Sequence, residues 1–350
     1  MGTSTGKTLL ILNDFGSFLG RVGNCFYVQA ADGRKTEVSA YNMEGIIVCN
    51  PGVTISVSAL RLALARGIGV SLASRTGIPH GFLHPALVSS SVAARRRQYQ
   101  AYAQAKGFEF ARIVAYQKLS NQAKLLRLYS RNRGKTMPSI AKLLASHSAE
   151  IERHATALMG IEANTVDAGR EAILQLEARG ARLYWSGISA LMPPYLNFVK
   201  RHGRGATDPV NAMLNFGYMG ILFREVWKSI LVAGLDPYAG FLHADRPNKP
   251  SLVLDMIEEF RQDAVDRTVV GLFTRRRLSR NIELVRNIDG RVRLAPRVLA
   301  LLCDSLVKRL RSPIRDTGIT LEAAIHDQAR RFSDFLLNRK NTYAPHSLRW

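Results

Sequence analysis

Short apolar runs separated by turn-forming residues occupy the first quarter of the chain, a pattern typical of β-strands. After the second run, Asp32 and Gly33 lead into residues 36–38, which predicts a hairpin with an Asp-Gly turn. Residues 57–66 differ, because their apolar positions recur at helical spacing before Gly67. We therefore expect a small, mostly β unit of about eighty residues. The apolar runs are residues 9–12, 26–28, 46–48 and 68–72.

Beyond the serine run at residues 89–91 the apolar positions follow the period of helices. The best-marked helix begins after Asp208, a suitable N-cap, with Pro209 at its first position and Gly234 after its end. The first periodic segment is long enough for one long helix or two. The helical segments are residues 93–129, 148–168, 172–191, 208–233, 252–260, 296–311 and 321–339.

These patterns predict an α+β protein with a small N-terminal β-rich domain followed by a larger, all-α C-terminal domain. We place the β-rich domain and a short linker in residues 1–88, and the helical domain with a basic C-terminal tail in residues 89–350. No internal repeat of fixed period is apparent.

The charge balance points to a polyanionic partner. The 350 residues include 49 Lys and Arg against 27 Asp and Glu, which gives a net charge of +22. Nucleic acid and an anionic membrane surface both fit this surplus. A membrane protein needs an apolar span or an amphipathic anchor, and the most apolar stretch, residues 221–235, is interrupted by Arg224, Glu225 and Lys228. Nucleic acid is therefore the better candidate.

Clusters of basic residues are the expected DNA-phosphate contacts, although each cluster alone is also compatible with an ordinary solvated face. Such contacts confer affinity and salt dependence and carry no sequence recognition. The clusters are Arg95, Arg96 and Arg97; Arg275, Arg276 and Arg277; Lys308 and Arg309; and Arg330 and Arg331.

The three cysteines, Cys25, Cys49 and Cys303, are widely separated and show no C-x-x-C spacing. This argues against a disulfide framework or a zinc knuckle and fits a reducing cytoplasm. The chain also opens without an apolar secretory segment and cleavage site, so we expect a cytoplasmic protein.

Residues 252–262 contain the first candidate for chemistry. Their apolar residues recur at helical spacing and leave Asp255 and Glu258, three positions apart, on a common polar side. Two carboxylates this close repel each other unless water or a cation separates them. A solvated helix face and a metal site are both consistent with the pattern.

Glu177 and His243 favour the metal site. His243 follows Phe241 and Leu242 just after an expected helix end, and Glu177 lies in a stretch where small residues allow close helix packing. An acid in such a crowded place needs a partner, which is either Arg182 or a shared cation. The histidines that lie in or beside ordinary amphipathic helix patterns, and suggest no site, are His147, His154 and His326.

Asn211, Asn215 and Tyr218 are spaced to form a polar stripe on an otherwise apolar helix. Buried hydrogen bonding explains this stripe as well as a place in the wall of an active site does, because buried polar groups need partners in either case.

Four ordered segments resemble the CRISPR-associated protein one family, the integrase that inserts new spacers into CRISPR arrays. The likeness covers most of the chain and is strongest over residues 177–267. The helix residues Lys118, Asn121 and Gln122 and the end of the chain at residues 343–350 also look like the family. The four segments are Glu177-x-x-x-Ala181-x-x-Tyr184-Trp185, Asp208-Pro209-Val210-Asn211-Ala212-x-Leu214-Asn215-x-Gly217-Tyr218, Ala233-Gly234-Leu235-Asp236-Pro237-Tyr238-x-Gly240-Phe241-Leu242-His243 and Ser251-Leu252-Val253-Leu254-Asp255-Met256-Ile257-Glu258-Glu259-Phe260-Arg261.

The resemblance implies that Glu177, His243 and Glu258 bind a divalent metal, Mg²⁺ or Mn²⁺, and that Asp255 is a nearby acid that assists catalysis. It also implies DNA endonuclease and integrase activity, with transesterification by a 3′-hydroxyl, and Tyr184 in contact with the DNA. The expected partners are double-stranded and branched DNA, the CRISPR repeat, a second copy of the chain bound through the β-rich domain, and CRISPR-associated protein two.

Two other functions remain as alternatives. A transposon-encoded integrase of the same family would share the metal chemistry and differ in its target. A basic scaffold that only holds DNA ends would need no metal. Replacement of Glu177 or His243 by Ala tests the metal site, because strand joining with Mn²⁺ that survives either change contradicts it.

Overall fold

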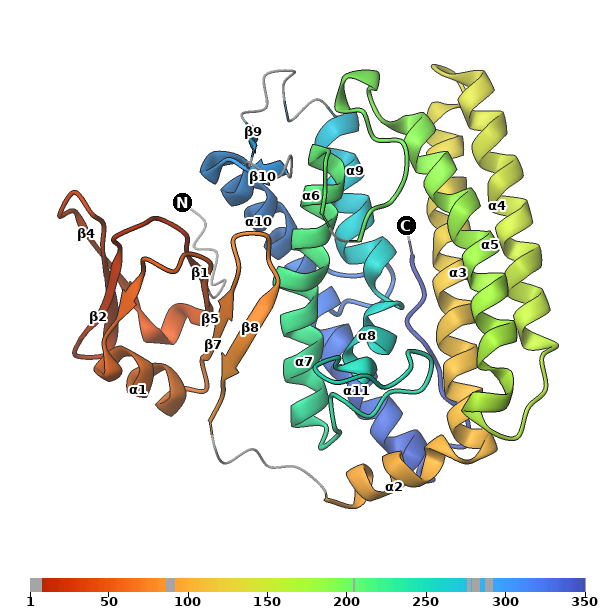
Figure 1. The fold of residues 1–350 in the computed structure, drawn as a ribbon, viewed down its shortest axis with the longest axis horizontal. Helices are drawn as coiled ribbons and strands as arrows, with labels where there is room; N and C mark the ends of the chain where they lie inside the picture. Colours follow the sequence, from red (N-terminus) through yellow and green to blue (C-terminus); the bar gives the residue numbers. More distant parts are fainter. Residues whose placement is uncertain are drawn as a thin grey trace.

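The computed structural model describes residues 8–85, 92–203, 205–275, 278, 284–286 and 292–349. Strands dominate up to residue 83 and long helices follow from residue 92 on, which confirms the predicted α+β class. Figure 1 shows the strands gathered at one end of the molecule and the helices filling the rest. The predicted domain boundary at residue 88 falls within residues 86–91, outside the described residues, and stays a prediction.

Two four-stranded sheets form the N-terminal part. In the first sheet the strand order is β1-β5-β7-β8, parallel except for the last pair, and in the second it is β4-β3-β2-β6. Helix α1 (Val57–Ala65) contacts β2 and β7, one strand of each sheet, and so closes a small apolar core between them. The strands are β1 (Thr8–Leu12), β2 (Phe18–Val22), β3 (Cys25–Gln29), β4 (Lys35–Ser39), β5 (Met43–Val48), β6 (Thr54–Ile55), β7 (Gly69–Ala73) and β8 (Pro79–Leu83).

The local predictions for this part hold. Strands β3 and β4 pair antiparallel, and Gly33 in their turn has a φ of 85°, which glycine adopts without strain. The four apolar runs lie on β1, β3, β5 and β7. Strands β2, β6 and β8 were not singled out, because their residues mix apolar with polar and glycine positions.

The helices that follow are α2 (Val92–Tyr102), α3 (Ala105–Arg133), α4 (Pro138–Met159), α5 (Val166–Leu191), α6 (Pro209–Phe216), α7 (Phe223–Val232), α8 (Ser251–Ile257), α9 (Arg267–Thr274), α10 (Pro296–Arg311) and α11 (Leu321–Leu336). Short 3₁₀ turns occur at Ala40–Asn42 and Pro194–Leu196, and π-helical segments η3 and η4 at Gly217–Leu222 and Arg261–Asp266. Strands β9 (Leu284–Arg286) and β10 (Val292–Leu294) pair antiparallel. The larger part is therefore mostly helical, whereas we expected it to be all-α.

Three helix predictions need comment. The segment 93–129 is two helices, α2 and α3. The predicted helix at 148–168 is wrong in its second half, because α4 ends at Met159 and α5 begins after Thr165, whose hydroxyl accepts the Ala168 N–H at 3.3 Å. The helix at 208–233 is confirmed, with the π-helical segment η3 joining α6 to α7.

The packing places the candidate site in the middle of the helical part. The long helices α3, α4 and α5 run side by side at one edge, and α8 lies between them and α7 (Figure 1). On the other side of α7, Phe82 of β8 stacks on Trp227 with ring centroids 5.0 Å apart, so the first sheet packs directly against the helical core.

The described helices and the cysteines bear on where the protein can reside. Within the part of the chain that the structure describes, we find no helix with the length and apolar character needed to span a bilayer. All three cysteines are free thiols, which agrees with the sequence analysis.

Candidate metal centre

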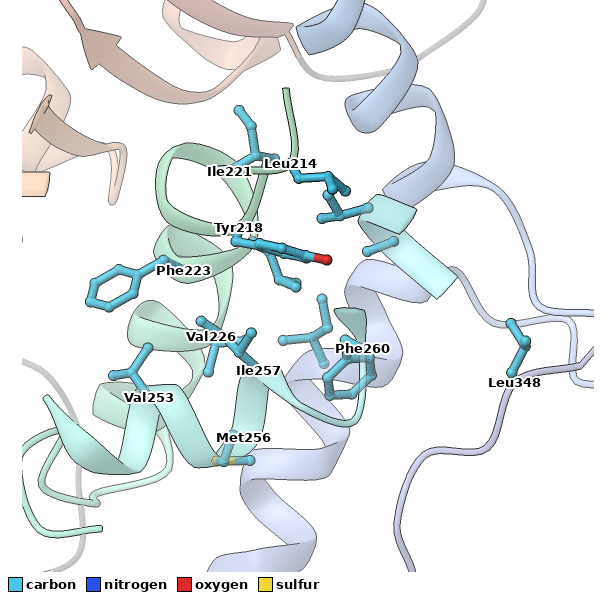
Figure 2. Packing of buried hydrophobic residues seen from close by; sticks show 14 of the residues in the cluster. Leu214, Tyr218, Ile221, Phe223, Val226, Val253, Met256, Ile257, Phe260 and Leu348 are labelled. Carbon is cyan, nitrogen blue, oxygen red and sulfur yellow. The ribbon is translucent and has the colours of Figure 1, made fainter. Parts of the chain in front are cut away.

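Glu258 is the most deeply buried of the predicted ligands. It directly follows α8, whose apolar residues Met256 and Ile257, with Phe260, pack into the large core as predicted (Figure 2). The polar side of this segment is buried as well, since Asp255 is 0% and Glu258 1% exposed. The interpretation of this side as an ordinary solvated helix face is therefore wrong.

Lys118 brings Glu177 and Glu258 together. Its Nζ lies 2.5 Å from Glu177 Oε1 and 2.8 Å from Glu258 Oε2, so one cation bridges carboxylates from α5 and the end of α8. Arg261 Nη1 lies 2.9 Å from the other oxygen of Glu258. The partner of Glu177 is thus Lys118 and not Arg182. In the sequence, Lys118 is connected to the site only through the family resemblance. The run of polar residues around it on α3 is the signal that could have pointed to a role in the site.

The neighbouring cations determine the charge state of Glu258. Burial alone raises the pKa of this carboxyl, but the charges of Arg261 and Lys118, with a contribution from His243, outweigh burial and lower the pKa to about 2. Glu258 is therefore ionised at neutral pH, as a metal ligand has to be.

Asp255 holds His243 in place. Its Oδ2 accepts the backbone N–H groups of Phe241 at 2.6 Å and Leu242 at 3.0 Å. Its Oδ1 accepts the backbone N–H of His243 at 2.9 Å and faces His243 Nδ1 at 2.7 Å. Four contacts occupy this fully buried carboxylate, and they leave His243 Nε2 as the ring nitrogen available to a ligand. The geometry therefore makes Asp255 a positioning residue.

Behind Glu258, two tyrosines share one buried carboxylate. Tyr184 donates to Asp266 Oδ2 at 2.7 Å, and Tyr218 donates to Asp266 Oδ1. Burial raises the pKa of Asp266 to about 6, although hydrogen bonds from both tyrosines oppose the shift. Two guanidinium groups lie over the Tyr218 ring, that of Arg261 at 4.6 Å and that of Arg201 at 5.3 Å from its centroid.

Tyr184 does not have the exposed face that stacking on a DNA base requires. Its side chain is 0% exposed and its hydroxyl is committed to Asp266. The expected contact of Tyr184 with DNA therefore finds no support in this structure. Together with Tyr218, Tyr184 forms a buried hydrogen-bonded group around Asp266.

Asn211 and Asn215 fasten the segment that carries Arg201. The Asn211 carbonyl oxygen accepts from Arg201 Nη1 at 3.0 Å and from the His202 N–H at 2.8 Å, while its amide nitrogen donates to the Lys200 carbonyl at 2.9 Å. Asn215 accepts from Arg201 Nη2 at 2.6 Å. Buried hydrogen bonding is thus the role that the structure gives this stripe, and its effect is to place Arg201 against Tyr218.

The C-terminal tail packs against residues 259–260, which directly follow Glu258. Tyr343 donates to Glu259 Oε1 at 2.5 Å, and the His346 N–H donates to Glu259 Oε2 at 2.7 Å. The His346 ring stacks on Phe260 at 4.6 Å, and Asn121 of α3 accepts the Leu348 N–H at 2.9 Å. Sequence reasoning gave these tail residues no role beyond family resemblance, because their partners lie far away along the chain.

The predicted basic clusters lie in different surroundings. Arg96 and Arg97 are exposed on α2 and Arg95 is half-buried, whereas Arg330 and Arg331 pair with Asp327. Arg275, Lys308 and Arg309, from two of the predicted clusters, line one cavity of about 530 Å³. Arg276 and Arg277 lie outside the described residues. The basic residues that line this cavity are Arg267, Arg275, Lys308, Arg309, Arg315 and Arg349.

The residues around Lys118 fit a divalent ion. Although Lys118 Nζ is 2.8 Å from Glu258 Oε2, this buried oxygen receives no hydrogen bond of acceptable geometry from any described residue. Two carboxylates and an imidazole with a free Nε2 are ligands that Mn²⁺ and Mg²⁺ sites use. Within the described chain, however, Glu177, His243 and Glu258 are not among the groups of three whose ligand atoms all lie within 4.8 Å of one another.

A profile of the CRISPR associated protein Cas1 family matches residues 10–302, which include all the residues of this centre. The chain belongs to this family. It is 33% identical over 318 residues to CRISPR-associated endonuclease Cas1 1 of Archaeoglobus fulgidus, which covers 89% of this chain and 91% of the relative. It is 34% identical over 245 residues to CRISPR-associated endonuclease Cas1 of Hyperthermus butylicus, covering 70% of this chain and 71% of the relative. The predicted family is thus confirmed.

Solved structures show the same fold. A casposase bound to its integration product superposes with a TM-score of 0.78 at 23% identity, covering 95% of this chain and 92% of the casposase. A Cas1 protein from Thermotoga maritima gives a TM-score of 0.77 at 20% identity, covering 96% and 99%. A chain of a Cas6-RT-Cas1–Cas2 complex gives 0.78 at 18% identity, covering all of this chain and 37% of that chain.

Proposed function

We propose that this chain is a metal-dependent DNA integrase and endonuclease of CRISPR adaptation, which inserts foreign DNA spacers into a CRISPR array by attack of a 3′-hydroxyl on a target phosphodiester. The observation that carries the proposal is the convergence of Glu177 and Glu258 on one cation position, where Glu258 keeps a buried oxygen without a hydrogen bond from any described residue. The relatives that bear the name endonuclease support the same chemistry.

In this proposal Glu177, His243 and Glu258 hold Mg²⁺ or Mn²⁺. When bound, the ion neutralises the scissile phosphate and orients the attacking 3′-hydroxyl. The protein's own groups prepare the position: Glu258 remains ionised, and Asp255 fixes the His243 ring with Nε2 available. Lys118 offsets the repulsion between the two carboxylates.

The basic cavity is our proposed contact with DNA phosphates. Arg275 and Lys308 are exposed at its lining, whereas Arg309 is anchored by its 2.5 Å contact with the buried Asp263. A fixed guanidinium beside two exposed cations suits a polyanion, since phosphate contacts need charge and little shape. Arg95, Arg96 and Arg97 on α2 are proposed as a separate group of phosphate contacts.

We extend the proposal to the assembly and its location. The proposal includes a homodimer formed through the β-rich residues 1–88. The further association with CRISPR-associated protein two is supported by the fold shared with the chain of a Cas6-RT-Cas1–Cas2 complex. Three free thiols suit the reducing cytoplasm, where we place the protein.

The experiment that tests the function is strand joining by the purified full-length protein. Wild type, Glu177→Ala and His243→Ala are incubated with branched DNA or CRISPR-repeat DNA, with Mn²⁺ or with EDTA. We expect joined products only with wild type and Mn²⁺. Glu171→Ala, which removes an exposed acid from the same helix as Glu177, is the matched control and should join normally.

The outcomes separate the alternatives. Joining that survives either active-centre substitution overturns the metal-centre assignment. Wild type that binds DNA but joins no strands with Mn²⁺ leaves a DNA-holding scaffold. Joining that needs the metal but shows no preference for CRISPR-repeat over unrelated DNA favours an integrase of the transposon type.

A further inference from the structure

A second group of potential ligands lies between α7 and α11, on residues that the proposed centre does not use. Glu225 comes from α7, and Glu322 and His326 come from α11. One ligand atom of each residue can be chosen so that all three lie within 4.8 Å of one another. Glu322 and His326 are four positions apart on one helix, so they share a face.

Glu225, one member of this group, has a buried oxygen without a hydrogen-bond partner among the described residues. Its side chain is 1% exposed, and Oε1 pairs with Arg224. Among the described residues, its Oε2 has no hydrogen-bond partner. Leaving a buried carboxylate oxygen in this state is costly, and a cation is the usual compensation.

The hydrogen bonds of Ser229 prepare His326 for a metal. Ser229 Oγ donates its single proton to the Glu225 carbonyl oxygen at 2.7 Å. The same oxygen lies 2.8 Å from His326 Nδ1 and can therefore only accept a hydrogen bond from this ring nitrogen. This requires the proton to sit on Nδ1 and leaves the lone pair on Nε2. Metal-ligating histidines are oriented in this way by an outer hydrogen bond.

Two nearby cations, Arg224 and Arg311, are committed to other carboxylates. Glu44 accepts from Arg311 at 2.5 Å and from Arg224 at 3.2 Å, and Arg224 also pairs with Glu225. In the described part of the chain, the side chain of Glu322 makes no ion pair or hydrogen bond. The positive charges of Lys228 and Arg224 act on Glu322, but neither residue forms an ion pair with it among the described residues.

We propose that Glu225, Glu322 and His326 form a second metal site, which binds a divalent transition ion such as Zn²⁺ or Mn²⁺ and ties α7 to α11. Two carboxylates and one neutral imidazole match the ligand preferences of these ions. Helix α11 leads into the tail that packs behind Glu259, so the ion stabilises the support of the candidate centre without taking part in its chemistry.

The test measures ion content in a background where the candidate centre is disabled. Full-length His243→Ala protein is stripped with EDTA, equilibrated with Zn²⁺ or Mn²⁺, and analysed for bound metal after gel filtration. We expect about one ion per chain. Adding Glu322→Gln with His326→Gln should weaken binding by at least about tenfold. The matched control, Glu171→Gln with His147→Gln on other helices, should leave it unchanged.

Two outcomes overturn the proposal: a His243→Ala background that binds neither ion, or ion content that the Glu322 and His326 substitutions leave intact. If the double variant fails to fold by circular dichroism, Ser229→Ala replaces it. That variant keeps all three ligands but no longer fixes the proton of His326 on Nδ1. It should weaken ion binding. We also expect the ion to raise the melting temperature of the His243→Ala protein, and Ser229→Ala should abolish this rise. An unchanged affinity in Ser229→Ala would also count against the site. Because His243 is absent throughout, these results do not depend on the proposed integrase chemistry.

Discussion

Replacing Asp255 by Asn tests whether this buried carboxylate acts through His243. Each of its oxygens faces two nitrogens, so changing either oxygen to an amide nitrogen removes two of the four contacts. Hydrogen bonds to a charged group contribute about 1.5–3 kcal/mol each, so the free energy of unfolding should fall by about 3–6 kcal/mol. That is a large part of the stability of about 5–15 kcal/mol of a typical domain.

Stability alone does not distinguish positioning from general support, so the assay also follows metal dependence. We expect the Mn²⁺ concentration for half-maximal strand joining to rise about 10–100-fold in Asp255→Asn, because His243 is no longer oriented. Joining should recover as Mn²⁺ is raised. Asp304→Asn, at an exposed acid on α10, is the control and should behave as wild type. An unchanged Mn²⁺ dependence, with or without a loss of stability, would refute the positioning role.

Three further predictions follow from the geometry. Asp266 has a raised pKa of about 6, so its contribution to stability is complete below its ordinary value of 3.8 and is lost as the pH rises through about 6. Asp266→Asn, which can still hydrogen bond both tyrosines, should remove this part of the pH dependence in urea unfolding between pH 4 and 7; an identical pH slope in both proteins would contradict it. A Cβ on Gly45 would lie 1.9 Å from Arg224 Nη1, whereas a Cβ on Gly81 meets nothing within 4 Å. Gly45→Ala should therefore lower the stability by about 1–3 kcal/mol in thermal unfolding while Gly81→Ala has little effect, and equal melting temperatures would show that Arg224 moves freely. Arg275→Ala should reduce the slope of log affinity for duplex DNA against log salt by about 1, and a slope equal to wild type would exclude Arg275 as a phosphate contact.

The sequence predicted well what depends on neighbours along the chain. Residues 296–311 form α10 with the predicted bounds, and Asp208 caps α6 by accepting the Asn211 N–H, because period and caps are local properties. The prediction across residues 160–165 failed because the apolar period was followed through Gly160, where α4 ends.

The candidate centre was only partly accessible from the sequence. Ordered motifs pointed to Glu177, His243 and Glu258, but periodicity alone could not say whether such acids were solvated or buried. His326 shows the same difficulty. It lies in an ordinary amphipathic pattern on α11, and its contact with Ser229 spans 97 positions.

By itself, then, the sequence determined the α+β class, most of the helices, the family and the predicted ligand residues of this protein. The tertiary structure alone decided that Lys118, 59 positions from Glu177, bridges the two carboxylates, and that Asp255 is used up in holding residues 241–243. The physical reason is that a pKa and a hydrogen bond depend on which distant segments exclude water from a side chain and which charges they bring to it. A local pattern of apolar and polar residues does not contain that information.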